Sequence, residues 1–359
     1  MERQIPFNRR EDKDVEALRQ VFEASGGELP PERMPQDLTS QQLNRLELDV
    51  KASADPARGE MIYRELSCES CHAIGGAGGL MGPDLSSLGA NAPTDYIIDG
   101  IINPSADIKD GYELTRIVRS DGSEVRGYVV NETSSEVVLR DISGEEISIP
   151  VNQIDTREVV PGSLMPPGLT SGLERKEFID LIGFLSKLGE TGEFRVPNEK
   201  LVRRWRTLAD NEEVIEQIDK TEMNFPVQNR TELSWQPAYS KVSGNLPVKE
   251  LPLLKIEDGK EYSFVKFELE ALSGGNVYLR FNSTDGITAW VGEDMLKKED
   301  EAMFVAELTK GINEFTLAIN RENQEGNAIQ IGSSRSEQLT CPNKAYYGQL
   351  TLSRVPFCG

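Results

Sequence analysis

The pattern of apolar residues and turn signals predicts a multidomain chain that changes from mainly helical to all-β along its length. Apolar residues recur at helical spacing in the first half, except in a block of short β-rich runs at 112–159. Strand-like runs with regular turn signals dominate from about residue 200. We therefore expect a helical N-terminal segment at 1–50, a mainly α domain at 51–190 with a β insertion at 112–159, and a jelly-roll-like β-sandwich at 200–359.

The N-terminal segment contains two candidate amphipathic helices. Apolar residues recur at helical spacing in 14–22 and again from Leu38 to Val50. Thr39 or Ser40 is suited to cap the second helix, and Pro30-Pro31 separates the two. We expect both to end a helical segment that begins upstream.

Three further helices are expected in the 51–190 domain. Asp55-Pro56 starts the first, with Asp as the cap and Pro at the first helical position, and this helix runs to Leu66. The second spans Thr94–Ile102, and the third spans Glu174–Leu188 with one apolar face. The insertion between the last two carries five short β-rich runs, which suggest a small barrel or a meander with a structural role.

Composition and charge exclude some classes of partner. Sixty acidic residues against 39 basic ones give a formal charge of −21, which argues against nucleic-acid binding and against an anionic membrane surface. No apolar run approaches the roughly 20 residues of a membrane span. The amino terminus is polar and charged, so no signal peptide is visible.

The segment Cys68-Glu69-Ser70-Cys71-His72 has the spacing of a covalent attachment site for c-type haem. The two thiols add to the vinyl groups of the porphyrin, and the histidine after them ligates the iron from the proximal side. His72 is the only histidine in the chain. One haem c per chain is therefore the predicted cofactor.

Two other uses of the motif compete with haem attachment. A structural zinc site needs four ligands, usually in two close pairs, and the other cysteines, Cys341 and Cys358, are distant and widely spaced. A dithiol redox site should follow a strand and open a helix, whereas here a helical stretch precedes the motif and glycines come after it. Both alternatives remain open, and haem attachment is favoured.

A second axial ligand and a hydrogen-bond partner for the histidine are also expected. Met165 lies in a proline-rich loop before a long amphipathic helix, and flanking prolines would stiffen that loop around a thioether ligand. Met81 lies too close to His72 in sequence to round the edge of the ring. A ligating histidine usually donates its other ring N–H to a carbonyl, and the Pro83 carbonyl is the candidate.

The sequence around these residues resembles a known family. The segment from about Asp55 to Leu188 is similar to the haem-binding c-type cytochrome domain of large multidomain proteins in planctomycetes and their relatives. The matching stretches are Asp55-Pro-Ala-Arg-Gly-Glu60, Cys68 to His72, Gly75 to Gly79, Gly82-Pro83-Asp84-Leu85, Asp121-Gly122 and Ser163-Leu-Met-Pro-Pro-Gly-Leu169. They span roughly a third of the chain.

The resemblance implies a mainly α class I cytochrome c core with a β-rich insertion between the histidine and methionine ligands. It also implies that Gly82-Pro83 is the turn that supports the proximal histidine. Family members often carry a β-propeller upstream, which this sequence lacks, so no dehydrogenase chemistry is carried over. Val202-Arg-Arg-Trp205 and the β-rich tail resemble, more weakly, the segment located after this domain in some relatives.

Haem of this type is normally attached outside the cytoplasm, so we expect a periplasmic or otherwise extracytoplasmic protein. In that case the chain is a mature form or the carboxy-terminal part of a longer exported protein. Cys341 and Cys358 then form a candidate disulfide.

The leading functional hypothesis is a one-electron carrier with His72 and Met165 as iron ligands and an unknown redox protein as partner. The first alternative is an oxidoreductase, or a haem-containing part of one, although a peroxidase commonly needs a second histidine. The second is a binding module for a glycan or a partner protein. Gly286-Ile-Thr-Ala-Trp290-Val-Gly resembles part of PA14-like carbohydrate-binding sandwiches, and Trp290 is a candidate for stacking on a sugar or for the core. The acidic residues near it are a candidate calcium site or a solvated loop: Asp285, Glu293 and Asp294.

Overall fold

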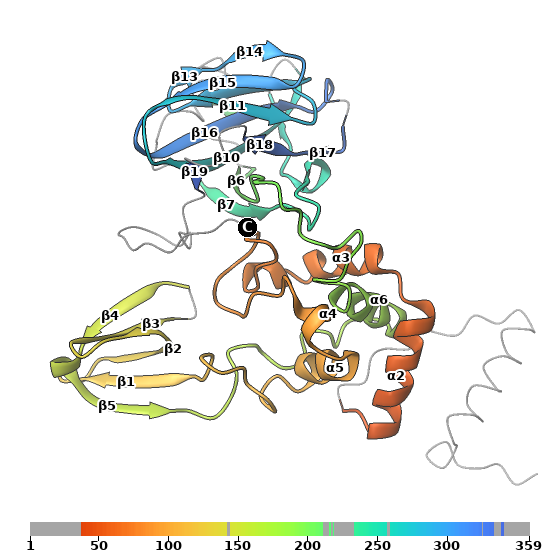
Figure 1. Cartoon of the computed structure of the whole chain (residues 1–359), viewed down its shortest axis with the longest axis vertical. Coiled ribbons are helices and arrows are strands. Elements are labelled where there is room, and N and C mark those ends of the chain that lie inside the picture. The colour runs from red at the N-terminus through yellow and green to blue at the C-terminus, as the bar shows by residue number, and fades with distance from the viewer. Residues whose placement is uncertain are drawn as a thin grey trace, which may run out of the picture.

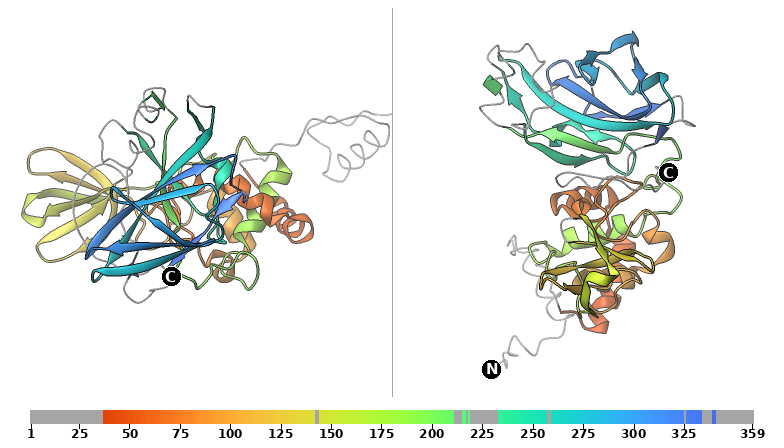
Figure 2. Two further views of the ribbon diagram at one scale, coloured as in Figure 1. Left: turned by 90° about the horizontal axis from the view of Figure 1, so that it is seen from above. Right: turned by 90° about the vertical axis from the view of Figure 1, so that its left-hand side faces the viewer.

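A computed structural model describes residues 37–141, 144–210, 215–216, 218, 233–256, 259–324, 326–333 and 339–340. It places a helical cluster beside a small β-sheet and below a larger two-sheet domain (Figure 1). The right-hand view in Figure 2 shows the same stacking from the side, and the left-hand view looks at the molecule from above. No helix among the described residues is long and apolar enough to cross a membrane.

The expectation of a mainly α class I cytochrome c core was wrong. The described residues are mostly β, with β1 to β19 in several sheets and five α-helices. The helices are α2 (Ser40–Ser53), α3 (Pro56–Glu65), α4 (Leu88–Asn91), α5 (Thr94–Ile102) and α6 (Arg175–Leu185). The four helices expected from Leu38 to Leu188 are present, whereas the one expected at 14–22 lies outside the described residues. The segments between the helices include irregular loops rich in glycine and proline, which do not favour helix.

The helical cluster is built around the contact between α3 and α6. Gly59 of α3 permits this contact, because a Cβ there would lie 2.6 Å from the Asp180 carbonyl carbon and 2.7 Å from Phe184 Cβ. Ile62 and Tyr63 of α3 join Phe184 in the shared apolar core. The helix α3 leads into the Cys68–His72 segment.

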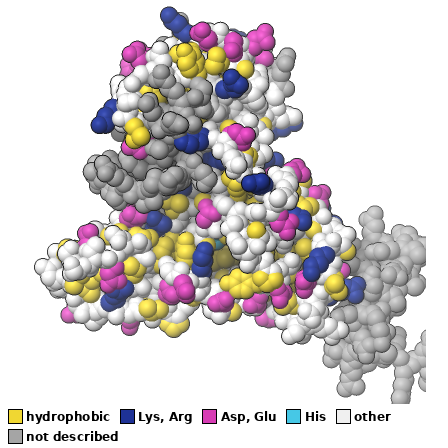
Figure 3. Space-filling view, in the orientation of Figure 1, with side chains coloured by type: hydrophobic (Ala, Val, Ile, Leu, Met, Phe, Trp, Pro, Cys, Tyr) yellow, Lys and Arg dark blue, Asp and Glu magenta, His cyan; other side chains and the backbone are white. Residues whose placement is uncertain are grey.

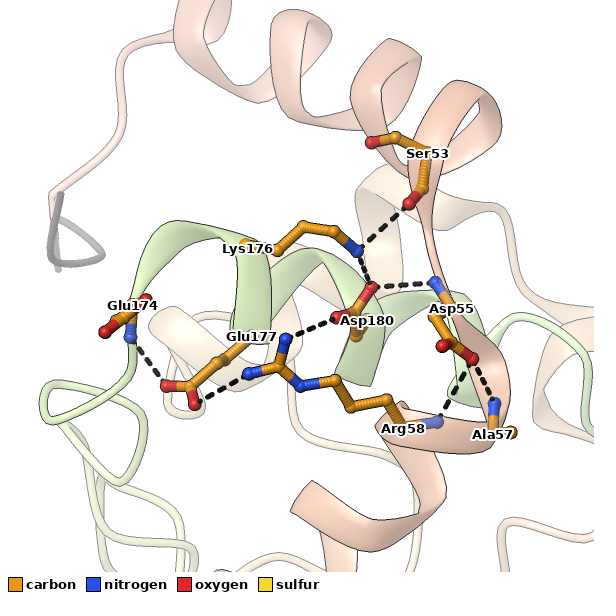
Figure 4. A network of polar contacts seen from close by, with 8 residues as sticks. All are labelled: Ser53, Asp55, Ala57, Arg58, Glu174, Lys176, Glu177 and Asp180. Carbon is orange, nitrogen blue, oxygen red and sulfur yellow. Dashed lines mark hydrogen bonds and ion pairs between the residues drawn. The ribbon is translucent and has the colours of Figure 1, made fainter. Parts of the chain in front are cut away.

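A buried carboxylate fastens the start of α3 to α6 (Figure 4). The Asp180 side chain is 0% exposed and accepts a 2.7 Å hydrogen bond from the Asp55 backbone N–H. It also forms an ion pair with Lys176 and lies 3.9 Å from Arg58, which reaches Glu177 at 3.2 Å. The charge of Asp180 is therefore compensated, as burial of a carboxylate requires.

The insertion is an open sheet, so of the two expected forms, a small barrel or a meander, the barrel was wrong. Its strands are β1 (Thr115–Arg119), β2 (Glu124–Glu132), β3 (Glu136–Arg140), β4 (Glu146–Pro150) and β5 (Ile154–Val159). Their order is β4-β3-β2-β1-β5, so β1 to β4 form a meander and β5 returns beside β1. The short helix η3 (Val151–Gln153) carries the chain from one edge to the other, and β4 and β5 remain edges.

The C-terminal domain contains two larger sheets that enclose one apolar core, as in a β-sandwich. The eight-stranded sheet contains β6 (Arg204–Leu208), β7 (Trp235–Tyr239), β9 (Leu254–Lys255), β10 (Glu261–Ala271), β12 (Ile287–Val291), β13 (Asp294–Met295), β16 (Gly311–Asn320) and β19 (Leu339–Thr340). The four-stranded sheet contains β11 (Gly275–Phe281), β14 (Lys297–Asp300), β15 (Met303–Leu308) and β18 (Ile331–Ser333). A separate pair is formed by β8 (Leu246–Pro247) and β17 (Ala328–Ile329), next to η4 (Val248–Glu250).

Trp290 belongs to the core and is not placed to stack on a sugar. Its side chain is 2% exposed and lies in a cluster with Phe264 and Leu254. Asp285 accepts a hydrogen bond from Ser283 and lies 3.8 Å from Lys298. The Asp285 side chain is also half exposed, so this residue lies in a solvated acidic loop.

Candidate functional site

The two thiols and the imidazole are presented by one tight turn. The short helix η2 (Cys68–Ser70) comes directly after α3, once Ser67 has taken a left-handed φ of 55°. The Cys68 carbonyl accepts hydrogen bonds from Cys71 N–H at 3.2 Å and from His72 N–H at 3.0 Å. Cys68 and Cys71 are free, partly buried thiols. The local backbone therefore brings both cysteines and the histidine into one turn.

One hydrogen bond orients the imidazole of His72. Its Nδ1 lies 2.9 Å from the Pro83 carbonyl oxygen, the contact expected from the sequence. A carbonyl oxygen only accepts, so Nδ1 carries the proton and, in a neutral ring, Nε2 carries the free lone pair. That is the arrangement of a histidine prepared to ligate a metal through Nε2.

Gly82 packs flat against the same ring. A Cβ at this position would lie 2.5 Å from His72 Cε1 and 2.6 Å from Nδ1. Gly82 N–H also donates to the Cys71 carbonyl at 2.8 Å. Burial lowers the pKa of His72, while the Pro83 carbonyl and Asp84 act in the opposite direction. The ring is therefore fixed in place and favoured as the neutral form.

The loop after His72 folds back over the cysteine turn. Gly79 N–H donates to the Glu69 carbonyl and Leu85 N–H to the Ala73 carbonyl, each at 2.8 Å. From the other side, the Tyr63 hydroxyl of α3 donates to the His72 carbonyl at 3.0 Å. Hydrogen bonds from the loop on one side and from Tyr63 on the other thus hold the cysteine turn in place.

The thiol environment disfavours the dithiol redox interpretation. Burial raises the pKa of Cys68 to about 12, and the Glu69 carboxylate acts in the same direction. A reactive dithiol needs the opposite shift, because the thiolate is the nucleophile and the metal ligand. A thioether has no proton to lose, so this environment suits a covalently attached group.

The β insertion contacts the loop after His72 at Leu80 and Met81. The Tyr128 hydroxyl of β2 donates to the Leu80 carbonyl at 2.7 Å and also to the Met81 carbonyl. Arg140 of β3 donates to the Leu80 carbonyl at 2.8 Å. Apolar side chains gather around a hollow between the insertion and the helical cluster (Figure 3). Neither Tyr128 nor Arg140 was expected at the site, because nothing in the sequence of a strand identifies the loop it contacts.

Met165 lies in the loop between β5 and α6. Its backbone N–H donates to Ser163 Oγ, and Ser163 N–H donates to Ser105 Oγ, each at 3.1 Å. The side chain is partly buried. The role of Met165 as an iron ligand remains a prediction.

The residues at the cysteine turn fit a covalent haem. Two free thiols, a fixed imidazole with an available Nε2, and a glycine surface against the ring are the parts such a group requires. Across the described ranges, no group of three or more His, Cys, Asp or Glu side chains is arranged to hold a metal ion. Cys341 and Cys358, with their candidate disulfide, lie outside the described residues.

Comparison with known proteins gives no family for this chain. No protein-family model matches, and no curated protein matches. Among solved structures, a β-glucosidase from Kluyveromyces marxianus in complex with glucose is similar at 7% identity and a TM-score of 0.23, over 36% of this chain and 16% of that chain. An anti-sigma factor domain-containing protein is similar at 10% identity and a TM-score of 0.22, over 65% of this chain and 78% of that chain. At such TM-scores neither likeness bears on fold or function.

Proposed function

We propose that Cys68, Cys71 and His72 attach one haem c covalently and that the chain carries single electrons. The observation that carries this proposal is the orientation of His72. Its Nδ1 is engaged by the Pro83 carbonyl at 2.9 Å, which leaves Nε2 as the nitrogen with a lone pair, and two free thiols belong to the same turn. When bound, the haem supplies an iron that cycles between the ferric and ferrous states.

The residues of this chain have separate tasks in that proposal. Cys68 and Cys71 bind the porphyrin edge as thioethers, and His72 Nε2 is the proximal ligand. Pro83 orients the histidine, and Met165 is the proposed ligand on the other face. Such a carrier needs a redox partner protein. It also needs an extracytoplasmic setting, since haem c is normally attached there.

The test is expression in a host with export and haem-attachment machinery, and then the pyridine haemochrome spectrum of the purified protein. We expect a c-type spectrum from the wild type and its loss in Cys71→Ser. Glu69→Gln is the matched control, because it changes a motif residue of the same turn but keeps both thiols. A colourless wild-type protein from such a host would refute the proposal.

A further inference from the structure

The side chain of Arg204, in the C-terminal domain, contacts the loop that follows the cysteine turn. Arg204 lies on β6, and its guanidinium donates from Nε to the Gly76 carbonyl at 2.8 Å and from Nη2 to the Gly78 carbonyl at 2.9 Å. The two carbonyls belong to the glycine loop, residues 75–79, which comes just after the haem-attachment motif. A planar guanidinium can bind two such acceptors at once, whereas an ammonium acts as a point charge.

The glycine loop depends on contacts from outside itself. Gly75, Gly76 and Gly78 take left-handed φ values of 58°, 79° and 126°, which glycine visits freely and which therefore cost conformational entropy to fix. Within the loop, Ile74 and Ala77 exchange backbone hydrogen bonds of 2.8 and 3.0 Å. The Arg204 fork adds two charge-assisted bonds on the outer side of this turn.

The glycine loop rests directly on His72. A Cβ at Gly78 would lie 2.9 Å from the carbonyl carbon of His72 and 2.8 Å from Ala73 Cα. Movement of the loop therefore moves the backbone that carries the imidazole. Arg204 acts on His72 through Gly76 and Gly78, whose carbonyls its guanidinium binds.

Other contacts hold the two domains together at this place. Arg64 of α3 donates from Nε and Nη2 to Glu250 Oε2, at 2.8 and 2.6 Å. Val242 N–H of the C-terminal domain donates to Glu60 Oε1 at 2.8 Å. These contacts keep β6 beside the glycine loop, so the Arg204 fork is part of a continuous interface.

We propose that Arg204 is a positioning residue that fixes the haem-attachment turn and raises the reduction potential of the haem held there. The inference rests on the proposed function. The guanidinium holds the loop on which the His72 backbone rests, and it brings a permanent positive charge to the turn. A nearby cation disfavours the oxidised state, which carries one more positive charge than the reduced state.

The experiment compares Arg204→Gln and Arg204→Lys with wild type. Arg280→Gln is the matched control, since it removes one exposed positive charge from β11 of the same domain. The first readout is the reduction potential of the haem-loaded protein by spectroelectrochemistry. We expect Arg204→Gln to lower it, Arg204→Lys to restore it in part, and Arg280→Gln to leave it unchanged. Equal potentials in wild type and Arg204→Gln would overturn the claim about potential.

The second readout does not need haem. Peptide-resolved alkylation of Cys68 and Cys71 is measured in the haem-free protein, where release of the loop exposes the thiols. We expect alkylation in Arg204→Gln and Arg204→Lys to be roughly tenfold faster, the change that 1.4 kcal/mol of lost anchoring gives. Unchanged rates would overturn the positioning role. If wild type bound no haem but the two variants were still alkylated faster than wild type, the proposed function and the claim about potential would be refuted, and the positioning role would be supported.

Discussion

At the scale of single residues, the site depends on how closely the Gly82 backbone approaches the imidazole of His72. The Cβ of an alanine would lie 2.5 Å from Cε1, so either the ring or the Gly82-Pro83 turn must move. Such overpacking typically costs about 1–3 kcal/mol. We therefore predict that Gly82→Ala lowers the free energy of unfolding by this amount in urea titrations and reduces haem attachment.

Gly100→Ala is the matched control for that prediction. Gly100 is an exposed residue of α5, and a Cβ there meets no atom within 4 Å outside the helix. Alanine is favoured over glycine in a helix by roughly 0.5–1 kcal/mol, so this variant should be more stable than wild type. If Gly82→Ala were as stable as Gly100→Ala, the packing of Gly82 on the ring would not matter.

Met165 gives a second prediction for one residue. If its thioether is the distal ligand, Met165→Ala opens one face of the iron, and the reduced protein then binds carbon monoxide rapidly. The measurement is the visible spectrum of the reduced protein before and after carbon monoxide. Met61→Ala is the control, because Met61 is 51% exposed on α3. Rapid binding by wild type would contradict the assignment of Met165.

Contacts within a short stretch of sequence were predictable, and contacts between distant strands were not. The Pro83 carbonyl lies 11 positions after His72, and the chemistry of a ligating histidine requires such an acceptor. Tyr128 and Arg204 reach the same turn from strands, where an alternating pattern reports burial and gives no partner. The sequence shows only that these two polar side chains lie in strands, and many strand residues share that feature.

At the scale of elements, local signals located the helices but misjudged the class of the domain. Thr39 caps α2 with a capping box, and Asp55 caps α3 with Pro56 at its first position, as expected. α6 ends a few residues earlier than its apolar pattern suggested. A cap and an apolar stripe report one helix at a time, so they do not reveal how much irregular chain and sheet lies between helices.

The insertion is expected to be anchored by Tyr128. This side chain is 3% exposed, and its hydroxyl supplies hydrogen bonds to the Leu80 and Met81 carbonyls. Tyr128→Phe should lower the free energy of unfolding by about 1 kcal/mol, since a net hydrogen bond contributes about that much. Tyr112→Phe is the control. The centroids of the Tyr112 and Tyr128 rings lie 4.9 Å apart, but the Tyr112 hydroxyl bonds to no described residue. Equal stability of the two variants would contradict this anchoring.

The charges along β1 and β2 predict a low carboxyl pKa on the insertion. Hydrogen bonds from Arg116 and then Arg126 lower the pKa of Glu124 from 4.5 to about 2. Any stability from this cluster is therefore present above pH 4.5 and is lost as the pH falls towards 2. In carboxyl NMR titrations, Arg116→Gln should raise the midpoint of Glu124 and leave that of Glu132, which pairs with Arg157, unchanged. An unmoved Glu124 midpoint would contradict the pairing.

At the scale of the whole molecule, one residue of the C-terminal domain packs into the apolar core of the helical cluster. Val242 is buried in the apolar cluster of α3, α5 and α6, and its N–H bonds to Glu60. Together with the Arg64–Glu250 pair, this contact makes the stability of the helical cluster depend on the C-terminal domain. We therefore expect one cooperative unfolding transition.

All three tryptophans lie in the C-terminal domain, so their fluorescence reports on that domain, while circular dichroism at the helical band reports on the helices. The two signals should change at the same urea concentration in wild type. Val242→Ala removes about two buried methylene equivalents, or roughly 1.6 kcal/mol, and should move both midpoints down together. Val291→Ala, which loses the same groups from the edge of the sandwich core, is the control within the domain. If Val242→Ala shifted only the helical signal, the domains would unfold independently, and Arg204 would then join two separate units instead of parts of one.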